Sequence, residues 1–120
     1  MTLKDFYDKN GSLSSMMATI PSEAAIQRLL GMLLQDQTME ELKRAVASGD
    51  VPLAFRAAHT LKGTLMNLQI TGVQKKASDV TEALRNASSV EDAAVLLPVL
   101  EEDYNDMISD LKELVGGSAS

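Results

Sequence analysis

Apolar residues recur every three or four positions along most of the chain, which is the period of an amphipathic helix. The helix expected after Asp50 has the clearest such stripe, which consists of Ala54, Ala58, Leu61, Leu65 and Leu68. Three further long stretches and two short ones before Pro21 show the same period. Short connections between long helices favour antiparallel packing. We therefore expect an all-α fold, an antiparallel four-helix bundle with short additional N-terminal helices.

The chain is expected to form one domain over residues 1–115. Residues 1–21 hold the short helices, residues 22–115 the bundle, and residues 116–120 a disordered tail rich in Gly and Ser. The short helices cannot be stable alone, so we expect them to dock across the end of the bundle, with a fraying arm as the alternative. Pro98 is expected to kink the last helix or to mark its start.

Helix starts are predicted from side chains that accept hydrogen bonds from the first free backbone N–H groups. Ser22 and Asp50 are predicted N-caps of this kind. Three further segments resemble capping boxes, in which side chain and backbone satisfy each other. These segments begin at Thr2, Thr38 and Thr71.

Composition narrows the class of protein. The net charge of −6 argues against a nucleic-acid partner, which requires clustered Lys and Arg. The absence of Cys excludes disulfides and thiol chemistry and fits a reducing cytoplasm. No apolar run approaches the roughly 20 residues of a membrane span, and the N-terminus lacks a signal-peptide pattern. We expect a cytoplasmic protein without a membrane partner.

The helix after Asp50 also has a stripe that a solvated face would not need. It places His59, which is the only histidine, beside Lys62 and Gly63, and adds Phe55 and Met66. A titratable ring, an ammonium and a bare backbone patch flanked by apolar groups are typical of a docking site. Phe55 and Met66 are equally compatible with the edge of the core.

Several short segments carry a family resemblance. The most specific is Ala58-His59-Thr60-Leu61-Lys62-Gly63, supported by Gly49-Asp50, Asn67-Leu68 and Thr81-Glu82-Ala83-Leu84-Arg85. Together they resemble the histidine-containing phosphotransfer (HPt) domain of bacterial phosphorelays. The opening Thr2-Leu3-Lys4-Asp5-Phe6-Tyr7 also resembles stand-alone members, so the resemblance covers nearly the whole chain.

The resemblance implies a role for each residue of the motif. His59 is the expected phosphoacceptor, Lys62 the electrostatic support of the phosphoryl group, and Gly63 the clearance that lets a partner approach. Phe55, Gly63 and Met66 are the expected partner-docking residues. Counting outward from the turn near Ile70 places Ser78, Thr81 or Glu82 beside His59. The family often has Gln at the offset of Thr81, so the resemblance implies that Thr81 helps to stabilise the phosphoryl group.

The sequence departs from the family pattern at two places. Thr81 stands where the family often has Gln, and its hydroxyl has a shorter reach. Gln69 stands where the family commonly has Gly, and its larger side chain is expected to alter the turn between helices.

The sequence has no recognisable catalytic groups for phosphoryl transfer beside His59 itself. It has no Gly-rich nucleotide loop and no carboxylate cluster near His59, whereas phosphoryl transfer uses metal ions and positioned charges. We expect no metal or cofactor in this chain, Mg²⁺ on the partner, and a monomeric phosphocarrier rather than an enzyme. The expected partners are response-regulator receiver domains, a hybrid histidine kinase, or both.

Two other classes of function are compatible with a helical bundle. One is an interaction module that binds a receiver without exchanging phosphate, against which the intact His59, Lys62 and Gly63 count. The other is a small hydrolase with His59 as general base, which lacks a paired Ser and Asp in sequence context.

Overall fold

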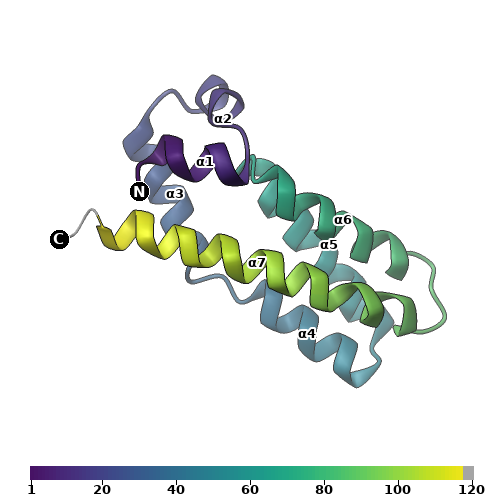
Figure 1. Cartoon of the computed structure of the whole chain (residues 1–120). Helices are drawn as coiled ribbons and strands as arrows, with labels where there is room; N and C mark the ends of the chain where they lie inside the picture. Colours follow the sequence, from purple (N-terminus) through teal and green to yellow (C-terminus); the bar gives the residue numbers. More distant parts are fainter. Residues whose placement is uncertain (118–120) are drawn as a thin grey trace.

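The computed structural model describes residues 1–117, which fold entirely into helices and connecting turns, without a strand (Figure 1). The all-α class is confirmed. None of the helices in this part of the chain combines the length and the apolar character that crossing a membrane requires. In chain order the helices are α1 (Leu3–Asn10), α2 (Leu13–Thr19), α3 (Glu23–Leu33), α4 (Thr38–Ser48), α5 (Val51–Asn67), α6 (Thr71–Leu84) and α7 (Glu91–Gly117).

The last four helices surround the main core. Helix α5 packs against α4 and α6, and α7 packs against the same two helices (Figure 1). The predicted apolar stripe of α5 is buried along its length, because each of its members faces the space that the four helices share. Aliphatic side chains, Met107 and Tyr104 fill the rest of this space.

The N-terminal helices close one end of the molecule, which confirms docking over a fraying arm. Helix α1 buries Leu3, Phe6 and Tyr7, and it packs against α6 and α7. The Tyr7 hydroxyl donates a hydrogen bond of 2.8 Å to the backbone carbonyl of Leu68. Burial also raises the pKa of Tyr7 to about 12.

Two further contacts hold the N-terminal segment in place. Lys9 and Asn10 both bind the Asp110 carboxylate, which ties α1 to α7. The backbone N–H of Ser12 donates to the carbonyl of Gln69, 3.1 Å away, in the turn between α5 and α6. Gly11 is required there for space, because a Cβ at this position would lie 1.8 Å from the same carbonyl oxygen.

Some helix starts follow the prediction. Thr2 and Asp5 form a capping box, and Ser22 caps α3. The Asp50 carboxylate accepts a 3.1 Å hydrogen bond from the backbone N–H of Leu53, so it fixes where α5 begins.

The other two predicted capping boxes are wrong. Thr38 and Thr71 are the first residues inside their helices rather than caps. The N–H of Thr38 instead donates to the Asp36 carboxylate at 2.7 Å. The spacing of a capping box also occurs within a first helical turn, so the pattern alone did not distinguish the two positions.

Helix α7 begins at Glu91 and continues through Pro98, so Pro98 does not mark its start. It also includes Gly116 and Gly117, so it extends two residues beyond the predicted domain end at residue 115. The remaining part of the predicted disordered tail, residues 118–120, lies outside the described residues.

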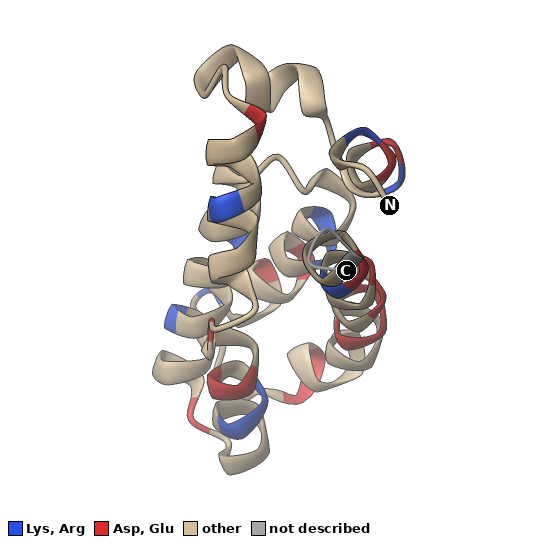
Figure 2. Cartoon of the chain, turned by 90° about the vertical axis from the view of Figure 1, so that its left-hand side faces the viewer, with Lys and Arg blue, Asp and Glu red and all other residues tan. Residues whose placement is uncertain are grey.

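Charge is unevenly distributed over the helices. Helix α7 carries eight acidic residues against one basic residue, Lys112. Figure 2 shows red positions along one side of α7, whereas α1 and α4 carry both blue and red positions.

Candidate functional site

His59 lies in the middle of α5 with an exposed side chain. Its neighbours Ala58 and Leu61 are buried, so the packing of α5 fixes the helix while the imidazole points away from the core. The ring stacks on Phe55 one turn earlier, with centroids 5.9 Å apart and planes inclined by 2°. The imidazole is thus held against an aromatic ring and remains open to solvent.

Phe55 is half-buried and is part of two contacts at once. It packs against the edge of the core, and its ring also lies under the Arg85 guanidinium, whose central carbon is 5.2 Å from the ring centroid. The reading of Phe55 as the edge of the core therefore describes a real contact, and its role in docking stays a prediction. The sequence predicted the position of Phe55 beside His59, but it did not predict the contact between Phe55 and Arg85.

Arg85 is the residue that sequence reasoning missed. It follows the last residue of α6 and binds Glu82 through two hydrogen bonds, at 3.2 and 3.1 Å. The signal was available, because counting outward from Ile70 places Arg85 opposite Phe55 just as it places Thr81 opposite His59.

Lys62 is half-buried and lies one turn after His59. Its positive charge also acts on Glu82 of α6. The hydrogen bonds from Arg85 hold the pKa of the Glu82 carboxyl below its usual range, and the Lys62 ammonium adds to this effect from a longer distance. The Lys62 ammonium thus lies one turn from the exposed imidazole, where its positive charge favours an incoming phosphoryl group.

Gly63 leaves the surface beside His59 open. A Cβ at this position would have no neighbour within 4 Å, so no part of the chain occupies the space above it. Met66 follows on the same stripe with 44% of its surface exposed. The predicted docking residues therefore lie on an accessible face with an apolar component.

Thr81 does not join this group. Its side chain is completely buried, and its hydroxyl donates a 2.7 Å hydrogen bond to the carbonyl of Ala77 within α6. The placement disagrees with the predicted contact to a phosphoryl group, because the only proton of the hydroxyl is already donated in the core. Thr81 is left out of the site.

Gln69 occupies the turn after α5 in a left-handed conformation, with φ of 56°. Such a conformation is uncommon for any residue that has a Cβ, which explains why Gly suits this position. The turn forms with Gln69 in place.

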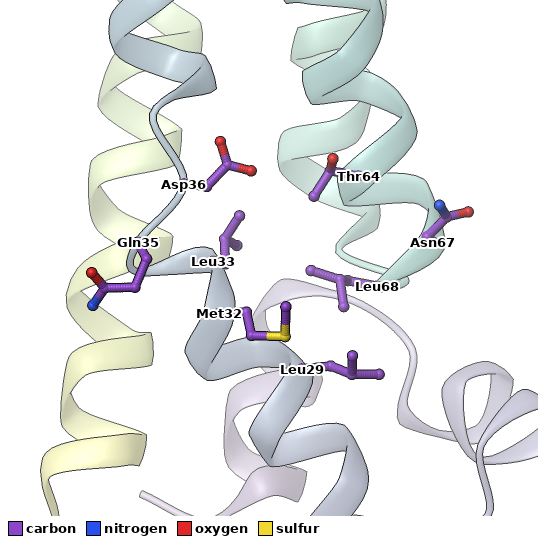
Figure 3. A pocket seen from close by; sticks show the side chains of 8 residues that line it. All are labelled: Leu29, Met32, Leu33, Gln35, Asp36, Thr64, Asn67 and Leu68. Atoms are coloured by element: carbon purple, nitrogen blue, oxygen red, sulfur yellow. The ribbon is translucent and has the colours of Figure 1, made fainter.

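A cavity of about 340 Å³ lies between the ends of α3 and α5 (Figure 3). Leu29, Met32 and Leu68 face the same gap, with Asp36 and Thr64 at its edge. Its other lining residues are Leu33, Gln35 and Asn67. Thr64 is five residues after His59, which is roughly 7.5 Å along the helix axis and about 140° around it, so the cavity opens on a different side of α5 from the imidazole. Sequence reasoning gave no sign of this cavity, because its walls come from two helices whose relative position the periodicity does not fix.

Within residues 1–117, no group of three or more His, Asp or Glu side chains is placed to hold a metal ion. The chemistry that the site itself offers is a nucleophilic imidazole nitrogen, an adjacent ammonium and an open approach.

Comparison with known proteins gives one match. A family model described as "Hpt domain" matches residues 28–113, which extend from α3 into the last turns of α7 and include His59. No curated protein and no solved structure matches the chain.

Proposed function

Because the chain belongs to the Hpt domain family, whose members carry phosphoryl groups on a histidine in two-component phosphorelays, we propose that His59 is its phosphoacceptor. The observation that carries this proposal is the exposed imidazole in mid-helix, next to the ammonium of Lys62 and the open backbone at Gly63. The chain is then a phosphocarrier between two receiver domains rather than a turnover enzyme.

The transfer is a substitution at phosphorus. A lone pair of the neutral imidazole forms a P–N bond while the P–O bond to the receiver's aspartate breaks and leaves a carboxylate. The imidazole loses its excess proton to solvent, and the reverse reaction passes the phosphoryl group to a second receiver. Lys62 stabilises the added negative charge, and the stacked Phe55 ring limits how far the imidazole can rotate.

We propose that the receiver supplies the catalytic groups for the transfer. Phosphoryl transfer benefits from a metal ion that neutralises charge at the transition state, and we place that Mg²⁺ and its carboxylates on the receiver. The docking face that we propose on this chain consists of Phe55, Gly63 and Met66. We also propose that the antiparallel arrangement of α4 to α7 is what holds this face rigid, supported by the packing of these helices around one core. The carrier is proposed to act as a cytoplasmic monomer.

The decisive experiment uses a receiver domain labelled with radioactive phosphate on its aspartate. We expect the label to move to the full chain as an acid-labile, alkali-stable phosphate, and to be absent from His59→Gln. A matched control is Asn105→Ala, which alters an exposed polar residue of α7. Binding of the receiver without transfer of label would assign the chain to the non-transferring interaction modules instead.

A further inference from the structure

Exposed apolar side chains gather at a second place, far from His59. Within two turns of α7, Val95 is 74% exposed, Val99 46% and Leu96 36%. We call these three residues the α7 patch. Single exposed apolar residues are ordinary, whereas a contiguous group on a soluble protein marks an interaction surface.

Pro98 adds a polar feature to the same stretch. Because Pro has no N–H, the carbonyl of Ala94 cannot receive the usual helical hydrogen bond from residue 98. Ala94 and Pro98 are both exposed. The surface thus offers a backbone acceptor next to apolar side chains, which suits a partner that brings hydrogen-bond donors.

Acidic residues flank the α7 patch on both sides. Glu91 and Asp92 precede it, Glu102 and Asp106 follow it, and all four side chains are exposed. Glu101, by contrast, is paired with Lys43 of α4. The field around the patch is negative, so it attracts cations and repels anionic surfaces.

This charge pattern identifies the kind of occupant. If a second copy packed its α7 antiparallel on the patch with Val95 opposite Val99, Asp92 would lie opposite Glu102. Like charges would then oppose one another on both sides of the contact, which disfavours self-association. A helix with apolar residues at three- or four-residue spacing, flanked by Lys or Arg, complements both the apolar centre and the acidic border.

The patch is also separate from the phosphotransfer face. Helices α5 and α7 each pack against α4 and α6, so their exposed sides point away from the shared core in different directions (Figure 1). A partner on α7 leaves His59 accessible.

We propose that the α7 patch is a docking surface for a cationic amphipathic helix of a partner protein, used independently of the exchange of phosphate at His59. Binding at this surface keeps the carrier near a partner protein while receiver domains bind to and dissociate from α5.

The test titrates the full ¹⁵N-labelled chain with an 18-residue amphipathic helical peptide of Leu and Lys. We expect amide shift changes to concentrate on residues 91–106, and Val95→Ser with Val99→Ser to weaken binding at least tenfold. Both valines are exposed, so the double variant should keep the circular dichroism of the parent chain. The peptide with Glu in place of Lys is expected not to bind.

The matched control is Met32→Ser, which removes an apolar side chain that is 64% exposed on α3. We expect it to bind the Leu and Lys peptide as the parent chain does. Shift changes centred on α3 or α5, or an equal loss of binding in the control, would overturn the proposal. So would sedimentation of the free chain as a dimer that the valine substitutions dissociate. None of these measurements uses phosphate, so the result is independent of the role of His59.

Discussion

Replacing Gly63 should make the protein more stable and less active at the same time. Gly in a helix interior is less favourable than Ala by about 0.8–1.0 kcal/mol, and Leu is nearly as favourable as Ala. A Cβ at Gly63 meets nothing within 4 Å, so neither Gly63→Ala nor Gly63→Leu introduces a clash that would offset this gain. We expect each variant to gain up to about 1 kcal/mol, which raises the melting temperature by roughly 3–6 °C for a chain of this size.

Transfer of phosphate should fall as the side chain grows. The receiver's aspartate has to approach the imidazole over the bare backbone at Gly63, so bulk there separates the reacting atoms. A loss of about 1.4 kcal/mol at the transition state lowers the rate tenfold. We expect Gly63→Leu to lose at least this much and Gly63→Ala to lose less, measured as the transfer rate from a phosphorylated receiver.

The matched control is Gly31→Ala, which also lies within a helix and has no neighbour within 4 Å of its Cβ. It should raise stability in the same direction and leave transfer unchanged. If Gly63→Leu unfolded at a lower urea concentration than the parent chain, the packing argument would be wrong. If it transferred phosphate at the parental rate, the bare backbone at Gly63 would have no role in docking.

Three further changes test the surroundings of His59 and the N-terminal helices. Lys62→Ala should slow transfer about tenfold while changing stability by less than about 0.5 kcal/mol, and an unaltered rate in the folded variant would make Lys62 an ordinary surface charge. Phe55→Ala should weaken receiver binding by about 1 kcal/mol and cost less stability than the roughly 3–5 kcal/mol of a fully buried Phe. Titration and urea unfolding of the same sample separate the two, and unchanged affinity would leave Phe55 with a role in the core alone. Tyr7→Phe should cost about 1 kcal/mol, because it leaves the Leu68 carbonyl without its donor. Burial raises the pKa of Tyr7 from 10.0 to about 12, so the unfolded chain releases this proton first and stability falls as the pH rises from 10 to 12. Urea unfolding at pH 8 and pH 11 should show a smaller difference for Tyr7→Phe than for the parent chain, and equal differences would contradict the assignment.

The helical period predicted which side of α5 is buried, and the structure bears this out from Ala54 to Leu68. It could do so because one turn of helix fixes the direction of each side chain relative to its neighbours. The same reasoning left His59 exposed. Local geometry was therefore enough to predict the buried and exposed faces of a single helix.

Contacts between helices were harder to predict. Thr81 is opposite His59 by count, yet its hydroxyl bonds the carbonyl one turn back, an option that Thr always has within a helix. Counting from the turn places Arg85 opposite Phe55, but whether the two side chains touch depends on how α5 and α6 rotate about their axes. The cavity at Leu29 and Leu68 depends on where α3 ends relative to α5, and no periodicity within one helix encodes that.

The contacts of α1 with the turn after α5 determine how far the domain can be shortened at its N-terminus. The family match starts at residue 28, so a fragment trimmed to it would lose Tyr7, Gly11 and Ser12. The carbonyls of Leu68 and Gln69 would then lose the donors that now satisfy them, and the α1 side of the core would face water. The unit recognised by sequence similarity is therefore smaller than the unit that folds, and the extra residues belong to the turn that ends the helix of His59.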